Sequence, residues 1–385
     1  MQILGIETSC DETAIAVLEI KNNRVKVLTN TISSQIKLHA KYGGVVPNLA
    51  AREHVKNIGH VFKFALKESR TKIDNIDLIT VTRGPGLGPA LLVGIAFART
   101  LAWKYEKSLI GVNHLEGHIY SNWLPPIKKI KTLRSFSRVG PILNLIVSGG
   151  HTELVLMKGY GKYQIIGETL DDAIGEAFDK VARLLGFSYP GGPIISRLAE
   201  KGDPNSYPLP SPMIKSKDYN FSYSGLKTAV LYLIRELTKD SPLNSSRLLG
   251  EARSKGAVRR ISAQQKFDIA ASFQKAALEV IIKKTIKAAQ EYKVKSIFLS
   301  GGVSANKYLR EKLEQEAVSN NIGYSQPEME YTGDNAAMIA IGGYLNYKNP
   351  PPHKASAFAQ TSVDKSRGTI KNSWESVEMD ANLGF

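Results

Sequence analysis

One order of elements occurs twice in this chain, and this repetition most restricts the folds open to it. In the first half, an apolar run over residues 3–6 is followed by a polar turn over 7–13 and a second apolar run over 14–20. In the second half, residues 143–157 repeat this order of strand, turn and strand. Short apolar strands alternating with helical patterns follow each hairpin, which is typical of an α/β fold with mainly parallel, helix-covered sheets. We therefore expect an internal duplication within an α/β protein.

The length of the chain permits two lobes. At 385 residues it is long for one domain and can bury a large core without disulfide bonds. We expect an N-terminal lobe over residues 1–125, completed by a helix over 334–347 near the end of the chain. The C-terminal lobe is expected over residues 141–333.

Basic residues are in large excess. Lys and Arg total 51 against 35 Asp and Glu, which gives a net charge of +16. This excess suits a polyanionic partner, nucleic acid first among them, although a solvated basic surface or a Lys-rich lineage would produce the same charge. Two loop-like inserts, 126–140 with no acid and 239–266 with few, are interpreted as contact surfaces. The Pro-, Ser- and Lys-rich tail over 349–385 is expected to be disordered.

Several features bear on the compartment. Cys10 is the single cysteine, which excludes an intramolecular disulfide and a four-cysteine zinc site. The N-terminus begins with a strand-like run and resembles neither a secretory leader nor an Arg- and Ser-rich transit peptide. No apolar run reaches the length of about 18 residues that a membrane span needs. We expect a cytoplasmic protein without a membrane partner.

Two histidines indicate a metal site. His114 and His118 follow an apolar run over 108–112, and a helix beginning near Asn113 would place them on one face. Such a pair can present two imidazole nitrogens to one metal ion, although histidines at this spacing also occur as ordinary core or surface residues. Asp334 precedes the last helix, where an N-cap is its usual role. As a third ligand it would instead complete a set that suits Zn(II) or Fe(II) and leaves coordination positions open.

Two glycine-rich turns are candidates for binding phosphate. The turn 148–152 carries paired glycines that allow backbone N–H groups to close on an anion, although a plain hairpin turn has the same composition. The segment 300–306 follows a buried strand and precedes a helix, which is the arrangement that binds phosphate or nucleoside in α/β proteins. It lacks the Gly-x-Gly-x-x-Gly pattern and the lysine of a P-loop, so neither of those classes fits.

The turn over residues 7–13 differs because it holds three acids, Glu7, Asp11 and Glu12. A phosphate-binding turn would prefer none. Acids at this position point to a role with metal or water, or to a base that acts on a nucleophile. Alternatively, Asp11 and Glu12 only cap the turn, and the residues alone slightly favour that interpretation.

Taken together, eight ordered motifs resemble those of the tRNA adenosine threonylcarbamoyltransferases, a family once described as O-sialoglycoprotein endopeptidases. The resemblance covers about residues 1–345. The segments 128–138 and 244–260 look longer than the family core demands, and the tail after Asn349 matches nothing in the family. Tyr223 stands where the family usually has Phe. The motifs lie at 6–13, 113–118, 147–152, 178–180, 189–193, 221–227, 300–306 and 332–335.

The resemblance implies a duplicated actin-like, sugar-kinase-like ATPase fold of two lobes with a cleft between them. It also implies transfer of a threonylcarbamoyl group from threonylcarbamoyl-AMP to N6 of adenosine 37 in tRNAs that read codons beginning with A. The implied ligands are one divalent metal ion, Fe(II) or Zn(II), and an adenine nucleotide, either threonylcarbamoyl-AMP or ATP. The implied partners are tRNA, a paralogous actin-like protein and a small ATPase, with a homodimer as the alternative assembly.

The family motifs also assign roles to residues of this chain. The metal ligands would be His114, His118 and Asp334. Asp11 and Glu12 would lie near the acceptor amine as the catalytic pair. Contacts to the adenylate substrate would come from Ile146, Val147, Ser148, Gly149, Gly150, Asp179, Gly192 and Asn306.

Three other functions remain open at this point. A small-molecule carbamoyltransferase or kinase of the same fold would have a pocket for a sugar or acid and would need no tRNA. A metalloprotease is disfavoured, because the chain has Glu116 two residues after His114 and not the His-Glu-x-x-His order. A tRNA-binding scaffold without catalysis would tolerate alanine at the three metal positions.

Overall fold

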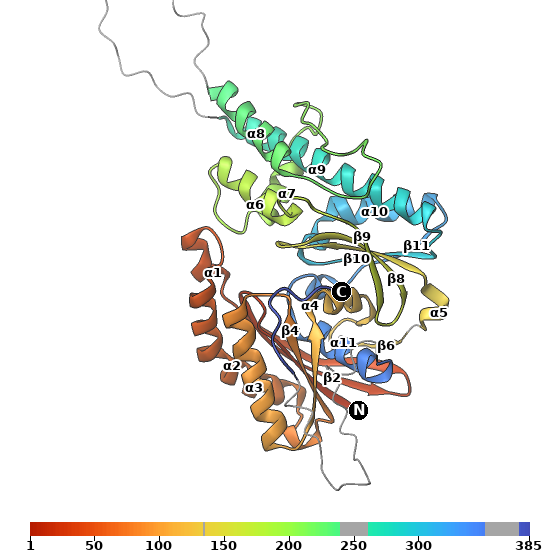
Figure 1. Ribbon diagram of the computed structural model, residues 1–385. Helices are drawn as coiled ribbons and strands as arrows, with labels where there is room; N and C mark the ends of the chain where they lie inside the picture. Colours follow the sequence, from red (N-terminus) through yellow and green to blue (C-terminus); the bar gives the residue numbers. More distant parts are fainter. Residues whose placement is uncertain (134, 239–260, 351–376) are drawn as a thin grey trace, which may run out of the picture.

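Two β-sheets of matching strand order form the two lobes of the protein, which lie one above the other in the computed structural model (Figure 1). The structure describes residues 1–133, 135–238, 261–350 and 377–385. The N-terminal sheet has the order β5-β4-β1-β2-β3-β6, and the C-terminal sheet has the order β11-β10-β7-β8-β9. Leaving out β6, each sheet is an antiparallel three-stranded meander flanked by two parallel strands. The expected duplication and α/β class are confirmed.

The strands of the N-terminal lobe are β1 (Gln2–Glu7), β2 (Glu12–Lys21), β3 (Arg24–Ser34), β4 (Leu78–Gly84), β5 (Ser108–Asn113) and β6 (Ile130–Thr132). Those of the C-terminal lobe are β7 (Ile142–Val147), β8 (Thr152–Gly159), β9 (Lys162–Glu168), β10 (Ser296–Ser300) and β11 (Gly323–Ser325). The helices are α1 (Ile36–His39), α2 (Pro47–Ser69), α3 (Gly88–Lys104), α4 (His114–Tyr120), α5 (Phe136–Val139), α6 (Ile174–Leu184), α7 (Gly192–Ala199), α8 (Ser224–Thr238), α9 (Ala263–Glu291), α10 (Lys307–Ser319) and α11 (Ala336–Lys348). Short 3-10 turns occupy 40–42, 73–75, 121–123, 302–305 and 329–331.

Alternating side chains divide the N-terminal lobe into two cores. Leu4 of β1 packs towards α2 and α3, whereas its neighbour Ile3 packs towards α4 and α11, as the two-residue period of a strand requires. Helix α11 comes very close to β1 at Gly5, where a Cβ atom would lie 2.2 Å from the carbonyl oxygen of Ala336. The last helix therefore belongs to the N-terminal lobe.

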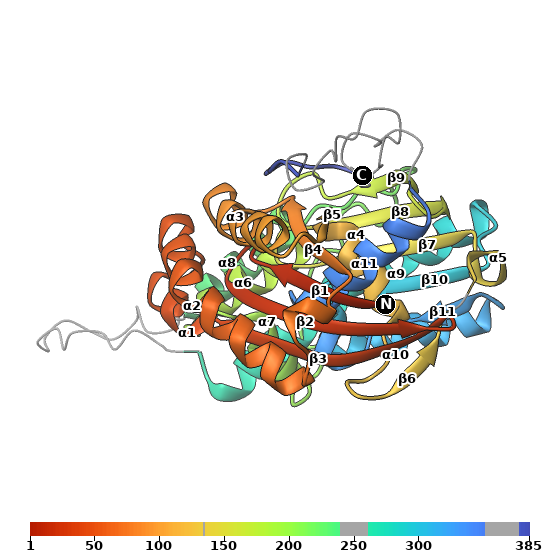
Figure 2. The same cartoon turned by 90° about the horizontal axis from the view of Figure 1, so that it is seen from below.

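The C-terminal sheet uses its two faces differently. Helices α6 to α10 cover one face and share a core with residues such as Leu143 and Leu154 (Figures 1 and 2). The other face, which includes Ile146, Val155 and Phe298, joins the core that holds α4 and α11. Helix α4 consequently lies between the lobes, enclosed by apolar side chains from both.

Parts of the inserts and of the tail differ from expectation. Within the insert 126–140 we expected a loop, but β6 pairs with β3 in antiparallel register. The side chain of Lys131 on β6 donates from Nζ to the carbonyl oxygens of Asn122 and Leu124. Of the insert 239–266, residues 239–260 lie outside the described part, and the rest leads into α9 through a capping box between Ser262 and Gln265.

The expectation of disorder over the whole tail is wrong for its last nine residues. Residues 377–385 pack on the N-terminal lobe, where Val377 is 1% exposed. Residues 351–376 lie outside the described part of the chain. Among the described helices, none combines the length and the apolar character needed to cross a membrane.

Candidate metal centre and substrate site

Helix α4 places the two histidines. Strand β5 ends at Asn113, whose side-chain Oδ1 accepts from the backbone N–H groups of Leu115 at 2.8 Å and Glu116 at 3.3 Å. This N-cap starts the helix at His114, as the sequence predicted. Four residues later His118 lies on the same face, and the centroids of the two rings are 4.7 Å apart.

Asp334 completes the group from the far end of the chain. Its Oδ1 lies 3.4 Å from Nε2 of His114 and 3.2 Å from Nε2 of His118. The N-cap of α11 is Asn335 and not Asp334, since Oδ1 of Asn335 accepts from the N–H of Met338 at 3.0 Å. The carboxylate of Asp334 is therefore available to face the histidines.

The donor set fits a metal ion. One ligand atom from each of His114, His118 and Asp334 lies within 4.8 Å of the other two. Both ring nitrogens of His118 are buried, and apart from the 3.2 Å contact between Nε2 and Asp334 they have no hydrogen-bond partner among the described residues, which is costly unless another ligand engages one of them. Two imidazoles and one carboxylate suit Zn(II) or Fe(II) and leave positions open for a substrate.

Glu7 contacts His114 at Nδ1, the ring nitrogen on the side away from Asp334. Its Oε2 lies 3.2 Å from Nδ1 of His114 and accepts from the hydroxyl of Thr82 at 2.5 Å. The hydroxyl of Ser9 also lies 3.2 Å from this Nδ1. A carboxylate on the Nδ1 side fixes the ring with Nε2 directed at the metal position. From the sequence, Glu7 was grouped with Asp11 and Glu12, but its partners differ from theirs: Glu7 contacts Thr82 and His114, whereas Glu12 accepts from Ser34.

The charges of the three candidate ligands act on one another. Burial acts to lower the pKa of His114, but the carboxylates of Asp334 and Glu7 outweigh it and raise that pKa well above its usual value. Burial lowers the pKa of His118. Burial acts to raise the pKa of Asp334, but the two imidazoles hold it far below its usual range. Asp334 is thus an anion that attracts either a proton on the histidines or a metal cation.

Asp11 and Glu12 form a second acidic pair beside the metal centre. Burial, with the neighbouring charges of Asp11 and Asp334, raises the pKa of Glu12 to about 9. Glu12 also accepts from the hydroxyl of Ser34 at 2.9 Å. Oδ2 of Asp11 is buried and has no hydrogen-bond partner among the described residues. A neutral acid beside a carboxylate is an arrangement suited to proton transfer.

The turn after β7 faces this centre from the C-terminal lobe. The hydroxyl of Ser148 accepts from the N–H groups of Gly150 and His151, and space is open beside Gly149 and Gly150 where a Cβ atom would lie. Burial and the charges of His114 and His118 lower the pKa of His151 to about 4, so it stays neutral. The sequence analysis quoted His151 within a motif but assigned it no role.

The two glycine turns lie side by side. Ile146 and Val147 are buried on β7, and Ile146 pairs with Ser300 at the end of β10. Gly301 adopts a φ of +88°, and a Cβ atom there would lie 2.4 Å from the carbonyl oxygen of Val147. Only glycine permits this approach, so Gly301 fixes the segment 300–306 against the turn 148–150.

Asp179 contacts the start of α7 at Gly192, and Asn306 contacts the second turn of the same helix. Oδ1 of Asp179 accepts from the N–H groups of Gly191 at 2.6 Å and Gly192 at 3.3 Å. Nδ2 of Asn306 donates to the hydroxyl of Ser196 at 2.8 Å and to Gln274 at 2.7 Å, and its Oδ1 caps α10. These side chains shape the wall of the site as well as being candidates for contact with substrate.

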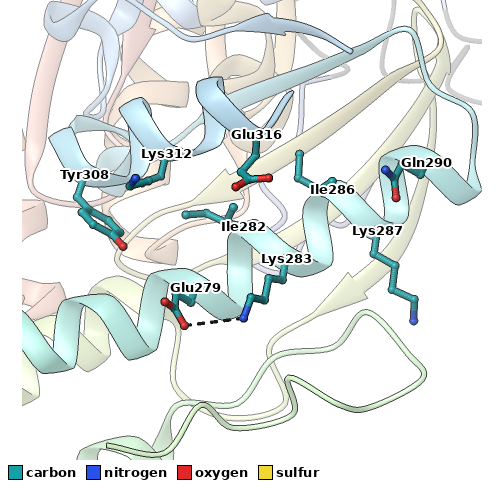
Figure 3. Close-up of a pocket in the computed structure, with 9 residues that line it drawn as sticks. All are labelled: Glu279, Ile282, Lys283, Ile286, Lys287, Gln290, Tyr308, Lys312 and Glu316. Atoms are coloured by element: carbon teal, nitrogen blue, oxygen red, sulfur yellow. Dashed lines mark ion pairs between the residues drawn. The ribbon is translucent and has the colours of Figure 1, made fainter. Parts of the chain in front are cut away.

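Two of the pockets on the C-terminal lobe bear on the location of the site. A pocket of about 430 Å³ is lined by Asn306, Ser196 and Gln274 among others, next to the expected substrate contacts. A pocket of about 450 Å³ lies between α9 and α10, with Ile282 and Ile286 at its floor (Figure 3). The larger pocket contains no residue of the metal triad and no predicted substrate contact, so we do not regard it as the active site.

The histidine helix does not have the chemistry of a zinc protease. Oε2 of Glu116 accepts from Nδ2 of Asn346 on α11 at 3.0 Å, so this carboxylate is turned into the core. It therefore anchors α4 on α11.

Comparison with known proteins identifies a family that matches most of the chain. The model of the tRNA N6-adenosine threonylcarbamoyltransferase family matches residues 26–341. The tRNA N6-adenosine threonylcarbamoyltransferase of Thermosipho africanus is 49% identical over 90% of this chain and 95% of its own. That of Bacillus cereus strain ATCC 14579 is 45% identical over 90% of this chain and 91% of its own.

A solved structure shows the same fold at low identity. The crystal structure of HypF from T. kodakarensis superposes with a TM-score of 0.55 and 16% identity over 89% of this chain. This chain spans only 47% of that one, so the likeness concerns the fold alone. The family match and the two relatives settle the classification: this chain belongs to the tRNA N6-adenosine threonylcarbamoyltransferase family.

Proposed function

We propose that the protein transfers the threonylcarbamoyl group of threonylcarbamoyl-AMP to N6 of adenosine 37 in tRNAs that read codons beginning with A. The observation that carries this proposal is the group of His114, His118 and Asp334 between the lobes, in a chain of this family. The proposal assigns the N-terminal lobe to metal and acceptor, and the C-terminal lobe to the adenylate.

The proposed transfer reaction needs mainly the correct positioning of donor and acceptor. The donor is a mixed anhydride and is already activated, so holding it close to the amine supplies a large part of the rate. A bound Fe(II) or Zn(II) ion would act as a Lewis acid on donor oxygens. His114, His118 and Asp334 would hold it, and Glu7 would keep His114 oriented.

Asp11 and Glu12 are proposed to handle the proton. N6 of adenosine attacks the carbamoyl carbon, the bond from that carbon to the phosphate oxygen breaks, and AMP leaves with the electron pair. Asp11 accepts the proton lost from N6 as the new C–N bond forms. Glu12, with its pKa near 9, remains a neutral hydrogen-bond donor beside it at pH 7.

The glycine turns are proposed to hold the adenylate. The open space beside Gly149, Gly150 and Gly302 leaves room for a phosphate and its ribose to approach the backbone. Asp179, Gly192 and Asn306, together with buried Ile146 and Val147 and the turn residue Ser148, would form the surrounding wall. This assignment extends the family resemblance to these positions.

The partners follow from charge and from exposed apolar groups. A net charge of +16 supports salt-dependent binding of tRNA phosphates. The outer side of α2 and α3 exposes Phe64 and Trp103, at 53% and 64%, and would suit a paralogous actin-like subunit. A small ATPase is proposed as a further partner, and a tRNA substrate places the reaction in the cytoplasm.

A reconstitution assay tests the function. The protein would be mixed with threonylcarbamoyl-AMP and an unmodified tRNA carrying A37, with and without the accessory proteins, and the tRNA digested to nucleosides. We expect threonylcarbamoyl adenosine from this tRNA and none from the same tRNA with G37. Its absence from every mixture, beside an active control enzyme, would reject the proposal. Transfer to a sugar or acid without tRNA would establish the small-molecule alternative.

A further inference from the structure

The last nine residues of the chain return to the metal centre. They are drawn in dark blue close to β4 and α4, and the C-terminus lies near β9 (Figures 1 and 2). The N–H of Asp380 donates to the carbonyl oxygen of Arg83 at 2.9 Å, and the N–H of Gly86 donates to that of Ala381 at 3.1 Å. The segment thus runs along the loop that follows β4.

The surface of the N-terminal lobe is shaped for this segment. A Cβ atom at Gly84, where φ is +153°, would lie 1.7 Å from the carbonyl oxygen of Asp380. A Cβ atom at Gly111 would lie 3.1 Å from Val377, whose side chain is fully buried. Met379 packs against the same core, which indicates a specific fit.

Two series of contacts connect the C-terminal segment to His114. Through the first, Ala381 holds Gly86, which packs directly on Ser9, and the hydroxyl of Ser9 lies 3.2 Å from Nδ1 of His114. Through the second, the carbonyl oxygen of Gly384 accepts from Nδ2 of Asn113 at 2.9 Å. The other side-chain atom of Asn113, Oδ1, caps the helix that begins at His114.

The terminal residue crosses to the other lobe. The ring of Phe385 lies 4.9 Å from that of Tyr163 on β9. The hydroxyl of Tyr163 donates to that of Tyr120, the last residue of α4, at 2.8 Å. The segment therefore contacts the end of β4 and the loop that follows it, the N-cap residue of α4, and the strand β9 that is bonded to the last residue of α4.

We propose that residues 377–385 are a C-terminal clasp, a positioning element that holds α4 and so His114 and His118 in the geometry that binds metal. The clasp touches no ligand atom and acts through Ser9, Asn113 and Tyr163. Its link to catalysis rests on the proposed function, whereas its hold on α4 does not. Releasing it should loosen α4 and weaken metal binding, and it should lower kcat more than it raises KM for tRNA.

The main test compares the full chain with a variant that ends at Ser376. Amide hydrogen exchange over residues 114–120 is expected to be at least about tenfold faster in the shorter chain, because local opening there becomes easier. A synthetic peptide of residues 377–385 should restore slow exchange, whereas a scrambled peptide should not. Unchanged exchange over 114–120, or faster exchange that the peptide does not reverse, would overturn the proposal. Exchange in α9 serves as a check that the C-terminal lobe is intact.

Point variants keep the test decisive if the shorter chain folds poorly. Asn113→Asp preserves an oxygen that caps α4 but removes the donor to Gly384. Phe385→Ala removes the ring that meets Tyr163, and Phe385→Tyr retains it. We expect affinity for Zn(II), measured by competition with a chelator, to fall about tenfold in the first two and to be kept in the third. Affinity for Zn(II) equal to that of the wild type in all three variants would contradict the clasp.

These readouts separate the clasp from the proposed function. If the full chain binds Zn(II) and the variants bind it as tightly, the clasp fails while the metal centre stands. If the full chain binds no metal, the proposed metal centre fails, and exchange over 114–120 alone decides on the clasp.

Discussion

Oδ1 of Asp334 lies 3.2 Å from Nε2 of His118, although one residue precedes the last helix and the other lies on α4 in the first third of the chain. The packing of α11 against α4 brings them together. At Gly117, between the histidines, a Cβ atom would lie 2.9 Å from Ile339 of α11, so the absence of a side chain lets the helices approach. The candidate metal centre therefore depends on the return of the chain to its N-terminal lobe.

The first prediction concerns the ligand set. His118→Ala should lose bound metal, because two remaining ligands rarely hold Zn(II) or Fe(II) at protein concentrations. His60→Ala on the exposed side of α2 is the matched control and should keep wild-type metal content. Elemental analysis after purification gives the answer, and equal metal in both variants would exclude His118 as a ligand.

The second prediction concerns Glu7. Glu7→Gln keeps the size of the side chain but removes the negative charge that faces Nδ1 of His114. Affinity for metal should fall by about 10- to 100-fold, as it does when groups that orient a ligand are changed. Glu311→Gln, on the exposed part of α10, should have no effect. Competition with a chelator measures both, and wild-type affinity in Glu7→Gln would show that the contact does not tune the metal centre.

The sequence predicted the duplicated fold because buried strands and helical patterns repeat along the chain, and each pattern is local. It predicted α4 at His114 because Asn113 is a good N-cap after an apolar strand. That Asp334 reaches His118 depends on helix packing, which spacing does not contain. The residues therefore offered Asp334 only as a candidate third ligand, and the family resemblance implied the assignment. The nearness of His151 to the two histidines could not be predicted, because His114 and His118 belong to the other lobe.

The tail shows why composition can mislead. Residues 349–385 are rich in Pro, Ser and Lys on average, and that average predicted disorder. The last nine residues nevertheless contain Val377, Met379 and Phe385, each of which packs against a core of the structure. Recognising this segment required knowledge of the surface on which it lies, with glycine at positions 84 and 111.

A third prediction follows from the pKa of Glu12. Burial and the charges of Asp11 and Asp334 raise that pKa to about 9, so the folded state holds a proton that the unfolded state releases near pH 4.5. Between these values the unfolded state binds fewer protons, and the stability of the metal-free protein must fall as pH rises. Glu12→Gln removes this dependence. The difference in free energy of unfolding between Glu12→Gln and wild type should therefore grow in favour of the variant as pH rises, by up to about 1.4 kcal/mol per pH unit.

Urea unfolding at pH 5, 7 and 9 in the presence of a chelator measures the difference between Glu12→Gln and wild type. Glu311→Gln provides a carboxyl on an exposed surface as the reference. A difference that stays constant across this range would show that Glu12 titrates at its usual pH. A difference that grows with pH would confirm the protonated acid beside Asp11.

The fourth prediction contrasts two glycines in the turns that are proposed to hold the adenylate. At Gly149 a Cβ atom meets nothing within 4 Å, so Gly149→Ala should fold with a stability within about 0.5 kcal/mol of wild type. Its new methyl group would enter the space assigned to the adenylate, and KM for threonylcarbamoyl-AMP should rise. At Gly301 a Cβ atom would lie 2.4 Å from the carbonyl oxygen of Val147, with φ at +88°, so Gly301→Ala should lose more than about 2 kcal/mol of stability.

Thermal unfolding and initial rates at varied donor concentration distinguish the two effects. If the turn after β7 binds the adenylate, Gly149→Ala changes KM with an intact fold, and Gly225→Ala on α8, also in open space, changes neither quantity. An unchanged KM in Gly149→Ala would place the donor elsewhere in the cleft. Loss of stability in Gly149→Ala would mean that the turn closes more tightly in solution than the open space beside Gly149 indicates.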